Sequence, residues 1–316
     1  MFKCKFTLNP TKFMNQLLSH PIINIANLLS ASNLLLGLFS IICTLNGKID
    51  IACYALLIAM GCDFLDGFAA RFFKTEGPLG KQLDSLADIV SFGIAPGALL
   101  FVMIIVGVDL DSLDNSQFVA NICPVNYDEF VHLKISQWVD SFFYNPKDSV
   151  RMFMGCPISM ESNIYDASIK YLPFVAFIIP LFAMFRLAKF NIDENQSKKF
   201  KGLATPMMTF FILFFPLFFN THKENWFELP LWLRSIFDCY FLATIGLVVA
   251  LLMLIPIPML NLKFRNLNFK ENIFKFLFLL TSLISIILLN IMAIPIIVLL
   301  YFVASIGELI YIKNEI

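Results

Sequence analysis

Four aspartates lie close together in an otherwise apolar part of the sequence. They are Asp63, Asp66, Asp84 and Asp88. Charged side chains are costly within apolar helices, so their presence here indicates a function rather than packing. Carboxylates that come close repel one another unless cations neutralise them, and Mg²⁺ and Mn²⁺ prefer such oxygen ligands. Because two such ions can hold a transferring phosphoryl group, the set predicts two-metal phosphoryl chemistry.

The spacing of these aspartates predicts two stripes on two helices. A helix has about 3.6 residues per turn, so Asp63 and Asp66 fall on one face of the first helix. Gly80, Asp84 and Asp88 recur at four-residue steps and form the stripe of the second. A short turn containing Gly and Pro joins the two helices. The stripes are therefore expected to face each other at one end of the helix pair.

Two neighbouring residues fit a phosphate-containing ligand. Gly67 removes a side chain beside the first stripe, which lets another backbone or a ligand come close. Arg71 follows one turn later and is always charged, so it can contact a phosphate oxygen. A single charge near a helix end could instead extend into water, but that explanation does not account for four aspartates on two coherent stripes.

The composition places this site in a membrane protein. Of the 316 residues, 59% are hydrophobic and 15% are charged, and the mean hydropathy is +0.78. So much apolar surface cannot be buried in water, whereas a bilayer accommodates it. The net charge is zero, which gives no indication of nucleic-acid binding. The first twenty residues are polar and basic and lack the apolar stretch of a signal peptide, so we expect residues 1–23 to be a cytoplasmic tail.

The apolar runs predict an all-α fold, a polytopic membrane helix bundle with about eight transmembrane helices, each of roughly 20 residues. The expected spans are 24–46, 49–73, 83–107, 169–190, 204–220, 238–258, 272–289 and 292–312. A turn around Asn290 to Pro295 is expected to separate the last two. Residues 24–260 are interpreted as the catalytic core and 261–316 as a C-terminal transmembrane hairpin.

The distribution of charge predicts the orientation. Every second connection is basic, which places both termini in the cytoplasm. The connection 108–168 is acidic instead, with nine Asp or Glu against three Lys or Arg. We therefore expect this insert on the outer side, where Trp138 and Phe142 to Tyr144 could lie at the membrane interface.

The seven cysteines lack zinc-site spacing. Cys123 and Cys156 of the insert could form a disulfide or remain as two thiols.

The aspartate region resembles the complete signature of the CDP-alcohol phosphotransferase family. Its elements are Asp63-x2-Asp66-Gly67-x2-Ala70-Arg71-x8-Gly80-x3-Asp84-x3-Asp88. The resemblance implies that the four aspartates bind two divalent ions, Mg²⁺ or Mn²⁺, and that Asp88 is also the catalytic base. It further implies that Gly67, Ala70, Arg71 and Gly80 contact the CDP-lipid. The expected reaction is attack of an acceptor hydroxyl on the β-phosphorus, with CMP as the leaving group.

Three further stretches resemble the phosphatidylserine synthase branch of this family. They are residues 83–96, 185–191 and 200–206. Together with the signature, the likeness covers most of residues 24–260. It departs from the usual pattern in the 108–168 insert, at Gly97 and at Ala204. The resemblance implies CDP-diacylglycerol and L-serine as substrates, phosphatidylserine and CMP as products, and a homodimer in the bacterial inner membrane.

Serine as acceptor requires a cation for its carboxylate. Arg186 could supply a bidentate contact, Lys189 a second charge, and Ser91 a contact to the amino group or hydroxyl. Alternatively, Arg186 and Lys189 are basic residues at the cytoplasmic end of a membrane span, where such residues commonly occur. Thr205 is predicted to begin the fifth helix rather than to contact substrate.

Polar residues of the first span form another candidate surface. Asn27, Ser30 and Asn33 stand at near-helical spacing. They could bind the cytosine or ribose of the CDP-lipid, and contact between helices explains such residues equally well.

Two other functions compete with serine transfer. The acceptor could be glycerol 3-phosphate or inositol, although a phosphorylated acceptor calls for a denser basic pocket. A divalent-cation transporter would instead place its carboxylates near mid-bilayer in interrupted helices. Here the carboxylates cluster at one end beside Arg71, which would repel a permeating cation. A catalytically inactive scaffold does not explain the intact set of four aspartates.

Overall fold

Long helices dominate the computed structural model, as the apolar runs predict. The structure describes residues 24–73, 75, 77–113, 131–132, 134–139, 150–153, 156–159, 170–192, 200–222, 226–260 and 272–315. The long helices in this part are α2 (Ile25–Leu45), α3 (Ile49–Phe72), α4 (Pro78–Ile89), α5 (Ala95–Leu113), α8 (Ile178–Ile192), α9 (Thr205–His222), α11 (Cys239–Leu254), α12 (Ile273–Leu289) and α13 (Ala293–Glu315).

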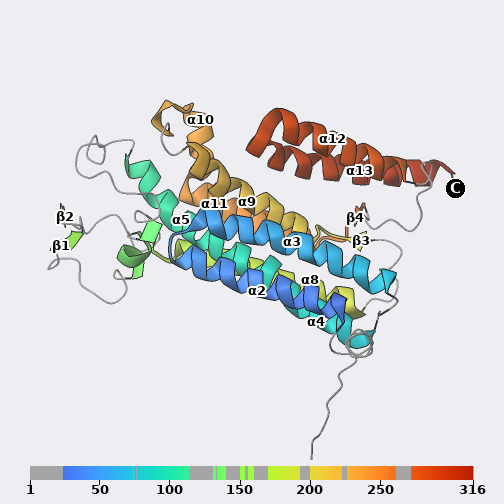
Figure 1. Ribbon diagram of the computed structural model, residues 1–316. Helices are drawn as coiled ribbons and strands as arrows, with labels where there is room; N and C mark the ends of the chain where they lie inside the picture. The colour runs from blue at the N-terminus through green and yellow to red at the C-terminus, as the bar shows by residue number, and fades with distance from the viewer. Residues whose placement is uncertain are drawn as a thin grey trace, which may run out of the picture.

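Successive helical segments run in alternating directions through one elongated bundle (Figure 1). The end of α3, the start of α4 and the C-terminal end of α13 gather at one end of the bundle. Strands β1 (Val150–Phe153) and β2 (Cys156–Ser159) lie at the opposite end. Strands β1 and β2 of the acidic insert are therefore at the end remote from the end of α3 and the start of α4.

Five helical stretches of the described residues are long and apolar enough to cross a membrane. They are Ile25–Leu45, Ile49–Phe72, Pro78–Gly107, Leu172–Ile192 and Ile273–Tyr311. A sixth arises if Leu231–Phe237 and Cys239–Leu254, bent by 63°, count as one span. The chain is an all-α polytopic membrane protein, while eight crossings are not confirmed by these lengths.

The C-terminal stretch Ile273–Tyr311 consists of two helices rather than one. The 3₁₀ turn η7 (Asn290–Met292) separates α12 from α13, and Asn290 has a φ of 48°. The two helices pack side by side (Figure 1). The sequence predicted this division, because Asn290 to Pro295 interrupts the apolar run.

Helix boundaries follow from local chemistry. The Asn24 side chain caps α2 by accepting a hydrogen bond from the backbone of Asn27 at 2.7 Å. Gly47, with a φ of 77°, makes the tight turn between α2 and α3. Pro78 begins α4, where a missing N–H costs nothing, and the Asp238 side chain caps α11. These signals place the ends of α2 and α3 close to the predicted ones.

The third segment is longer than predicted and contains a distortion. The apolar stretch Pro78–Gly107 begins before the predicted span 83–107, where the Gly80, Asp84 and Asp88 stripe already predicted a helix. A π-helical turn, η1 (Val90–Ile94), joins α4 to α5. Such turns often occur at functional sites. Gly97, where the sequence departs from the family pattern, packs against α8. A Cβ at this position would lie 3.0 Å from Cδ of Pro180, so the glycine allows the two helices to approach.

Two pairs of short antiparallel strands were not predicted from the sequence. In the insert, β1 pairs with β2, and Val150 is opposite Ser159. Strand β3 (Phe200–Lys201) pairs with β4 (Pro258–Met259) at the aspartate end. The second pair joins segments far apart in the sequence and precedes α9, so it helps to place Thr205.

The bundle is apolar both inside and outside. Phe92, Phe218 and Phe237 are fully buried in its core. Leu283 and Ile287 of α12 are exposed, as expected for side chains that face lipid. Trp138 was predicted to lie at the membrane interface, but its side chain is buried against Phe101. Its Nε1 donates to the carbonyl oxygen of Lys170 at 3.0 Å. The N-terminal tail, Phe142 to Tyr144 and Cys123 lie outside the described residues.

Candidate active site

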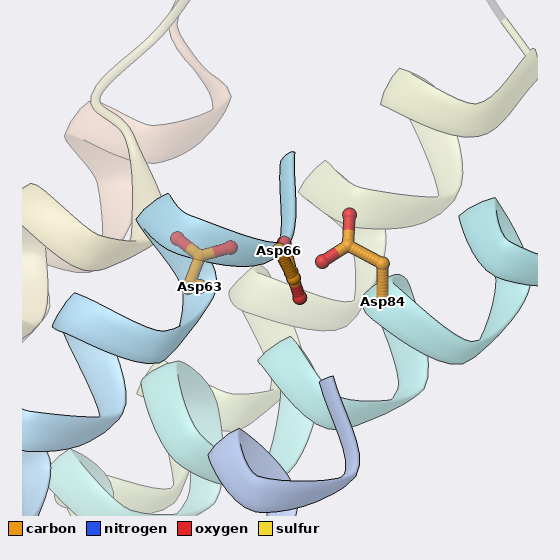
Figure 2. Close-up of side chains that lie close together, drawn as sticks. All are labelled: Asp63, Asp66 and Asp84. Carbon is orange, nitrogen blue, oxygen red and sulfur yellow. The ribbon is translucent and has the colours of Figure 1, made fainter. Parts of the chain in front are cut away.

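Three of the four aspartates converge between α3 and α4. Asp63 and Asp66 extend from α3 and Asp84 from α4, and their carboxylates face a common space with Asp66 in the middle (Figure 2). One carboxylate oxygen from each lies within 4.8 Å of the others. Oxygen donors at this spacing suit a hard divalent cation, so the cluster can hold a metal ion.

Asp88 lies one turn beyond Asp84 on α4 and is buried. Its carboxylate is not part of the close group of three, although all three lie within electrostatic range of it. The side-chain Nδ2 of Asn33, on α2, donates to Oδ1 of Asp88 at 3.2 Å. The fourth aspartate is therefore held by the neutral amide of Asn33.

Helix α2 supplies a second contact to the cluster. Oγ of Ser30 lies 2.6 Å from Oδ2 of Asp66 and 3.2 Å from the carbonyl oxygen of Ala26. Asn27 is buried, and its Oδ1 would lie 3.2 Å from a Cβ added to Gly80. Because Gly80 has no side chain, α2 and α4 approach closely beside the aspartates. Both predicted CDP-lipid contacts of α2 thus lie next to the signature.

The remaining signature residues line the α3 side. A Cβ added to Gly67 would meet no atom within 4 Å, so the half-buried glycine borders open space rather than another helix. Ala70 is also half-buried. Arg71 is exposed, and its Nε donates to the carbonyl oxygen of Gly67 at 2.8 Å. This arrangement leaves room for a ligand beside α3.

Arg186 is buried within the bundle, although it stands near the end of α8. One terminal nitrogen of its guanidinium donates to Oγ1 of Thr205 at 3.3 Å. Within the described part of the chain, its Nε has no hydrogen-bond partner. Asp88 and Tyr301 lie within electrostatic range. A basic residue that only flanks a membrane span is expected to extend into water, so the burial of Arg186 is unusual for such a residue.

The other two predicted serine contacts occupy different surroundings. Lys189 is exposed on α8, as expected for a flanking lysine. Ser91 is fully buried in η1, and its Oγ donates to the carbonyl oxygen of Asn33 at 2.8 Å. Ser91 therefore has a place in the contact between η1 and α2.

Two neighbours of Arg186 were not predicted as site residues. Thr205 begins α9 as expected, but its buried hydroxyl also accepts the hydrogen bond from Arg186. Tyr301 comes from α13, and its hydroxyl donates to the carbonyl oxygen of Leu260 at 3.0 Å. No local pattern marks Tyr301, because it reaches this region only through the packing of the C-terminal hairpin against α9.

Comparisons with known proteins agree with this geometry. Residues 23–116 match the model of the CDP-alcohol phosphatidyltransferase family. The CDP-diacylglycerol–serine O-phosphatidyltransferase of Helicobacter pylori strain J99 is 35% identical over 82 residues, which are 26% of this chain and 35% of that protein. The archaetidylserine synthase of Methanothermobacter thermautotrophicus is 40% identical over 83 residues, 25% of this chain and 35% of that protein.

A longer match has lower identity. The CDP-diacylglycerol–serine O-phosphatidyltransferase of Bacillus subtilis is 29% identical over 131 residues, which are 42% of this chain and 67% of that protein. The chain thus matches about a third of the length of the first two relatives and two thirds of the third. The family match includes α2 to α5 and all four aspartates. This part of the chain, residues 23–116, is therefore similar to the CDP-alcohol phosphatidyltransferase family.

Proposed function

We propose that this protein transfers the phosphatidyl group of CDP-diacylglycerol to the hydroxyl of L-serine, giving phosphatidylserine and CMP. The observation that carries the proposal is the convergence of the Asp63, Asp66 and Asp84 carboxylates within 4.8 Å. Buried Asp88 lies within electrostatic range of these three, and buried Arg186 lies within electrostatic range of Asp88. The names of the similar proteins from Helicobacter and Bacillus support serine as the acceptor.

The four aspartates divide into two roles in this proposal. Asp63, Asp66 and Asp84 would hold divalent ions, Mg²⁺ or Mn²⁺, with Asp88 as a shared ligand. When bound, these ions would neutralise the pyrophosphate and stabilise the negative charge of the leaving phosphate. Asp88 is also the proposed base: it accepts the proton of the serine hydroxyl as that oxygen bonds to the β-phosphorus. The bond from this phosphorus to the CMP oxygen breaks, and CMP leaves.

The substrates approach this centre from two sides in the proposal. Gly67, Ala70, Arg71 and Gly80 border the CDP-lipid, together with Asn27 and Ser30 of α2. The open space beside Gly67 and the exposed guanidinium of Arg71 support this placement. Arg186 binds the serine carboxylate, because its buried Nε has no partner in the described residues and its neighbour Asp88 is the proposed base. Lys189 and Ser91 complete the proposed serine contacts.

The proposal extends to the organisation of the molecule. Residues 24–260 form the catalytic core and 261–316 an appended hairpin. The site faces the cytoplasm of a bacterial inner membrane, because exposed Arg71, Lys81 and Lys189 lie on the helices at its end of the bundle. A homodimer, which the family resemblance implies, is also part of the proposal.

Release of CMP tests the reaction. Purified protein in detergent with CDP-diacylglycerol and Mg²⁺ or Mn²⁺ is expected to release CMP when serine is added, and chelation with EDTA is expected to stop this release. Parallel assays contain inositol or glycerol 3-phosphate instead. CMP release with one of these acceptors but not with serine would contradict the serine assignment and retain the reaction class.

Replacement of Arg186 tests the serine contact. Arg186→Ala is expected to raise the KM for serine by about 10–100-fold, since a charge-assisted pair at a buried site is lost. The KM for CDP-diacylglycerol should change little. Lys189→Ala, an exposed basic residue on the same helix, is the comparison and is expected to have a smaller effect on the KM for serine. An unchanged KM for serine in Arg186→Ala would exclude Arg186 as the carboxylate ligand.

A further inference from the structure

Asn33 is a fully buried amide on α2 whose side chain contacts Asp88. Its Nδ2 lies 3.2 Å from Oδ1 of Asp88. An amide can donate to a carboxylate only through its nitrogen, so this contact also determines which way the amide faces. Within the described residues, Oδ1 of Asn33 has no hydrogen-bond partner. The bond to Asp88 is therefore the one polar contact that the side chain makes in this part of the chain.

Packing alone does not account for an asparagine at this position. A buried carbonyl oxygen without a partner is unfavourable, and a leucine of similar size would fill the same space without that penalty. The presence of an amide is explained if its function is to orient the carboxylate of Asp88. An uncharged donor suits this function, because it orients the carboxylate without adding a competing charge beside the cluster.

The surrounding contacts hold Asn33 and Asp88 at a defined separation. Ser91 lies in η1, three residues after Asp88 of α4. Its Oγ donates to the backbone carbonyl oxygen of Asn33 at 2.8 Å. One turn along α2, a Cβ added to Gly37 would lie only 2.8 Å from Cα of Ser91. Helix α2 thus approaches η1 very closely beside the Asn33–Asp88 bond. Because backbone atoms take part in both contacts, Asn33 cannot easily move away from Asp88.

We propose that Asn33 is a positioning residue for the proposed base. By holding Oδ1 of Asp88, it limits rotation of the carboxylate and leaves Oδ2 to accept the proton of the acceptor hydroxyl. A base is effective only when its lone pair is directed at the proton it removes, so loss of this bond should slow the chemical step. The inference rests on the proposed function, since it assigns Asn33 a role in that same reaction.

The test compares two buried polar residues of α2. Asn33→Leu removes the contact to Asp88. Ser40→Ala removes a different buried contact between helices, in which Oγ of Ser40 donates to the carbonyl oxygen of Ala52 at 3.0 Å. Asn33→Leu is expected to lower kcat by about 10–100-fold, as loss of a supporting hydrogen bond at a catalytic centre does. The KM for each substrate is expected to remain within about threefold, and Ser40→Ala should retain the kcat of the unmodified protein.

Ligand binding provides a readout that does not depend on turnover. CDP-diacylglycerol with Mn²⁺ is expected to raise the melting temperature of Asn33→Leu by as much as it raises that of the unmodified protein. If the Asn33→Leu substitution prevents folding, Asn33→Gln retains a buried amide but displaces its donor. This variant is expected to lower kcat by about tenfold with the same binding of CDP-diacylglycerol.

Three results would overturn the inference. In the first, folded Asn33→Leu or Asn33→Gln retains the kcat of the unmodified protein. In the second, the substitution raises the KM for CDP-diacylglycerol instead of lowering kcat, which would make Asn33 a lipid contact. In the third, the unmodified protein releases CMP with no acceptor, which would overturn the proposed function and this inference together. Release of CMP by the unmodified protein only when serine is present separates the first two cases from the third.

Discussion

Asp88→Asn is expected to lower kcat by about 10²–10⁴-fold, the range that general base catalysis contributes. The substitution keeps the shape of the side chain but removes its ability to accept a proton from serine. Asp88 is buried and lies outside the close group of Asp63, Asp66 and Asp84, so those three carboxylates should still bind a cation. Binding of CDP-diacylglycerol is therefore expected to survive much better than turnover.

Measurement of CMP release and of melting temperature separates these two effects for Asp88→Asn. The melting temperature with CDP-diacylglycerol and Mn²⁺ should still rise, while CMP release nearly stops. Asp50→Asn is the control, because Asp50 is an aspartate in the first turn of α3, at the far end of the helix from the cluster. Full turnover in Asp88→Asn would remove Asp88 from the role of base.

Asp66→Asn is expected to abolish both metal binding and turnover. Asp66 is buried, lies between the other two carboxylates in Figure 2 and accepts a hydrogen bond from Ser30 at 2.6 Å. Loss of a supporting partner in a metal site costs about 10–100-fold in affinity, and loss of a central ligand should cost more. The neutral amide also removes one of the negative charges that attract the cation.

The distinguishing measurement for Asp66→Asn is the response to metal. Titration with Mn²⁺ should no longer raise the melting temperature, and CDP-diacylglycerol should no longer stabilise the protein in its presence. Asp50→Asn again serves as the control and should respond as the unmodified protein does. If Asp66→Asn binds Mn²⁺ with unchanged affinity, Asp66 is not a ligand and the metal site lies elsewhere.

The contrast between these two variants follows from their places in the fold. Both aspartates are buried, and both accept a hydrogen bond from α2, from Ser30 and Asn33 respectively. Asp66 shares a space with two other carboxylates, whereas Asp88 does not belong to that group. Loss of turnover with retained binding in one variant, and loss of both in the other, would support the division of roles among the four aspartates.

Much of the helical framework could be predicted from sequence, because the controlling signals are local. Apolar runs, the cap at Asn24 and the Gly47 turn set the ends of α2, and the break at Asn290 divides the last two helices. The four-residue steps of Gly80, Asp84 and Asp88 predicted a helix before the apolar run, and Pro78 begins it. The π-helical turn η1 was missed, since it depends on contacts with neighbouring helices such as that between Ser91 and Asn33.

The sequence by itself determined the four aspartates, their spacing on two helices and the apolar surroundings that make them costly, because each of these depends on neighbours within a few turns. Only the tertiary structure decided which three carboxylates share a space and which one is held by Asn33. It also decided that Arg186 is buried against Thr205, near Tyr301 of α13. These contacts join residues that are far apart in the chain, and helical periodicity does not specify which helix lies beside another.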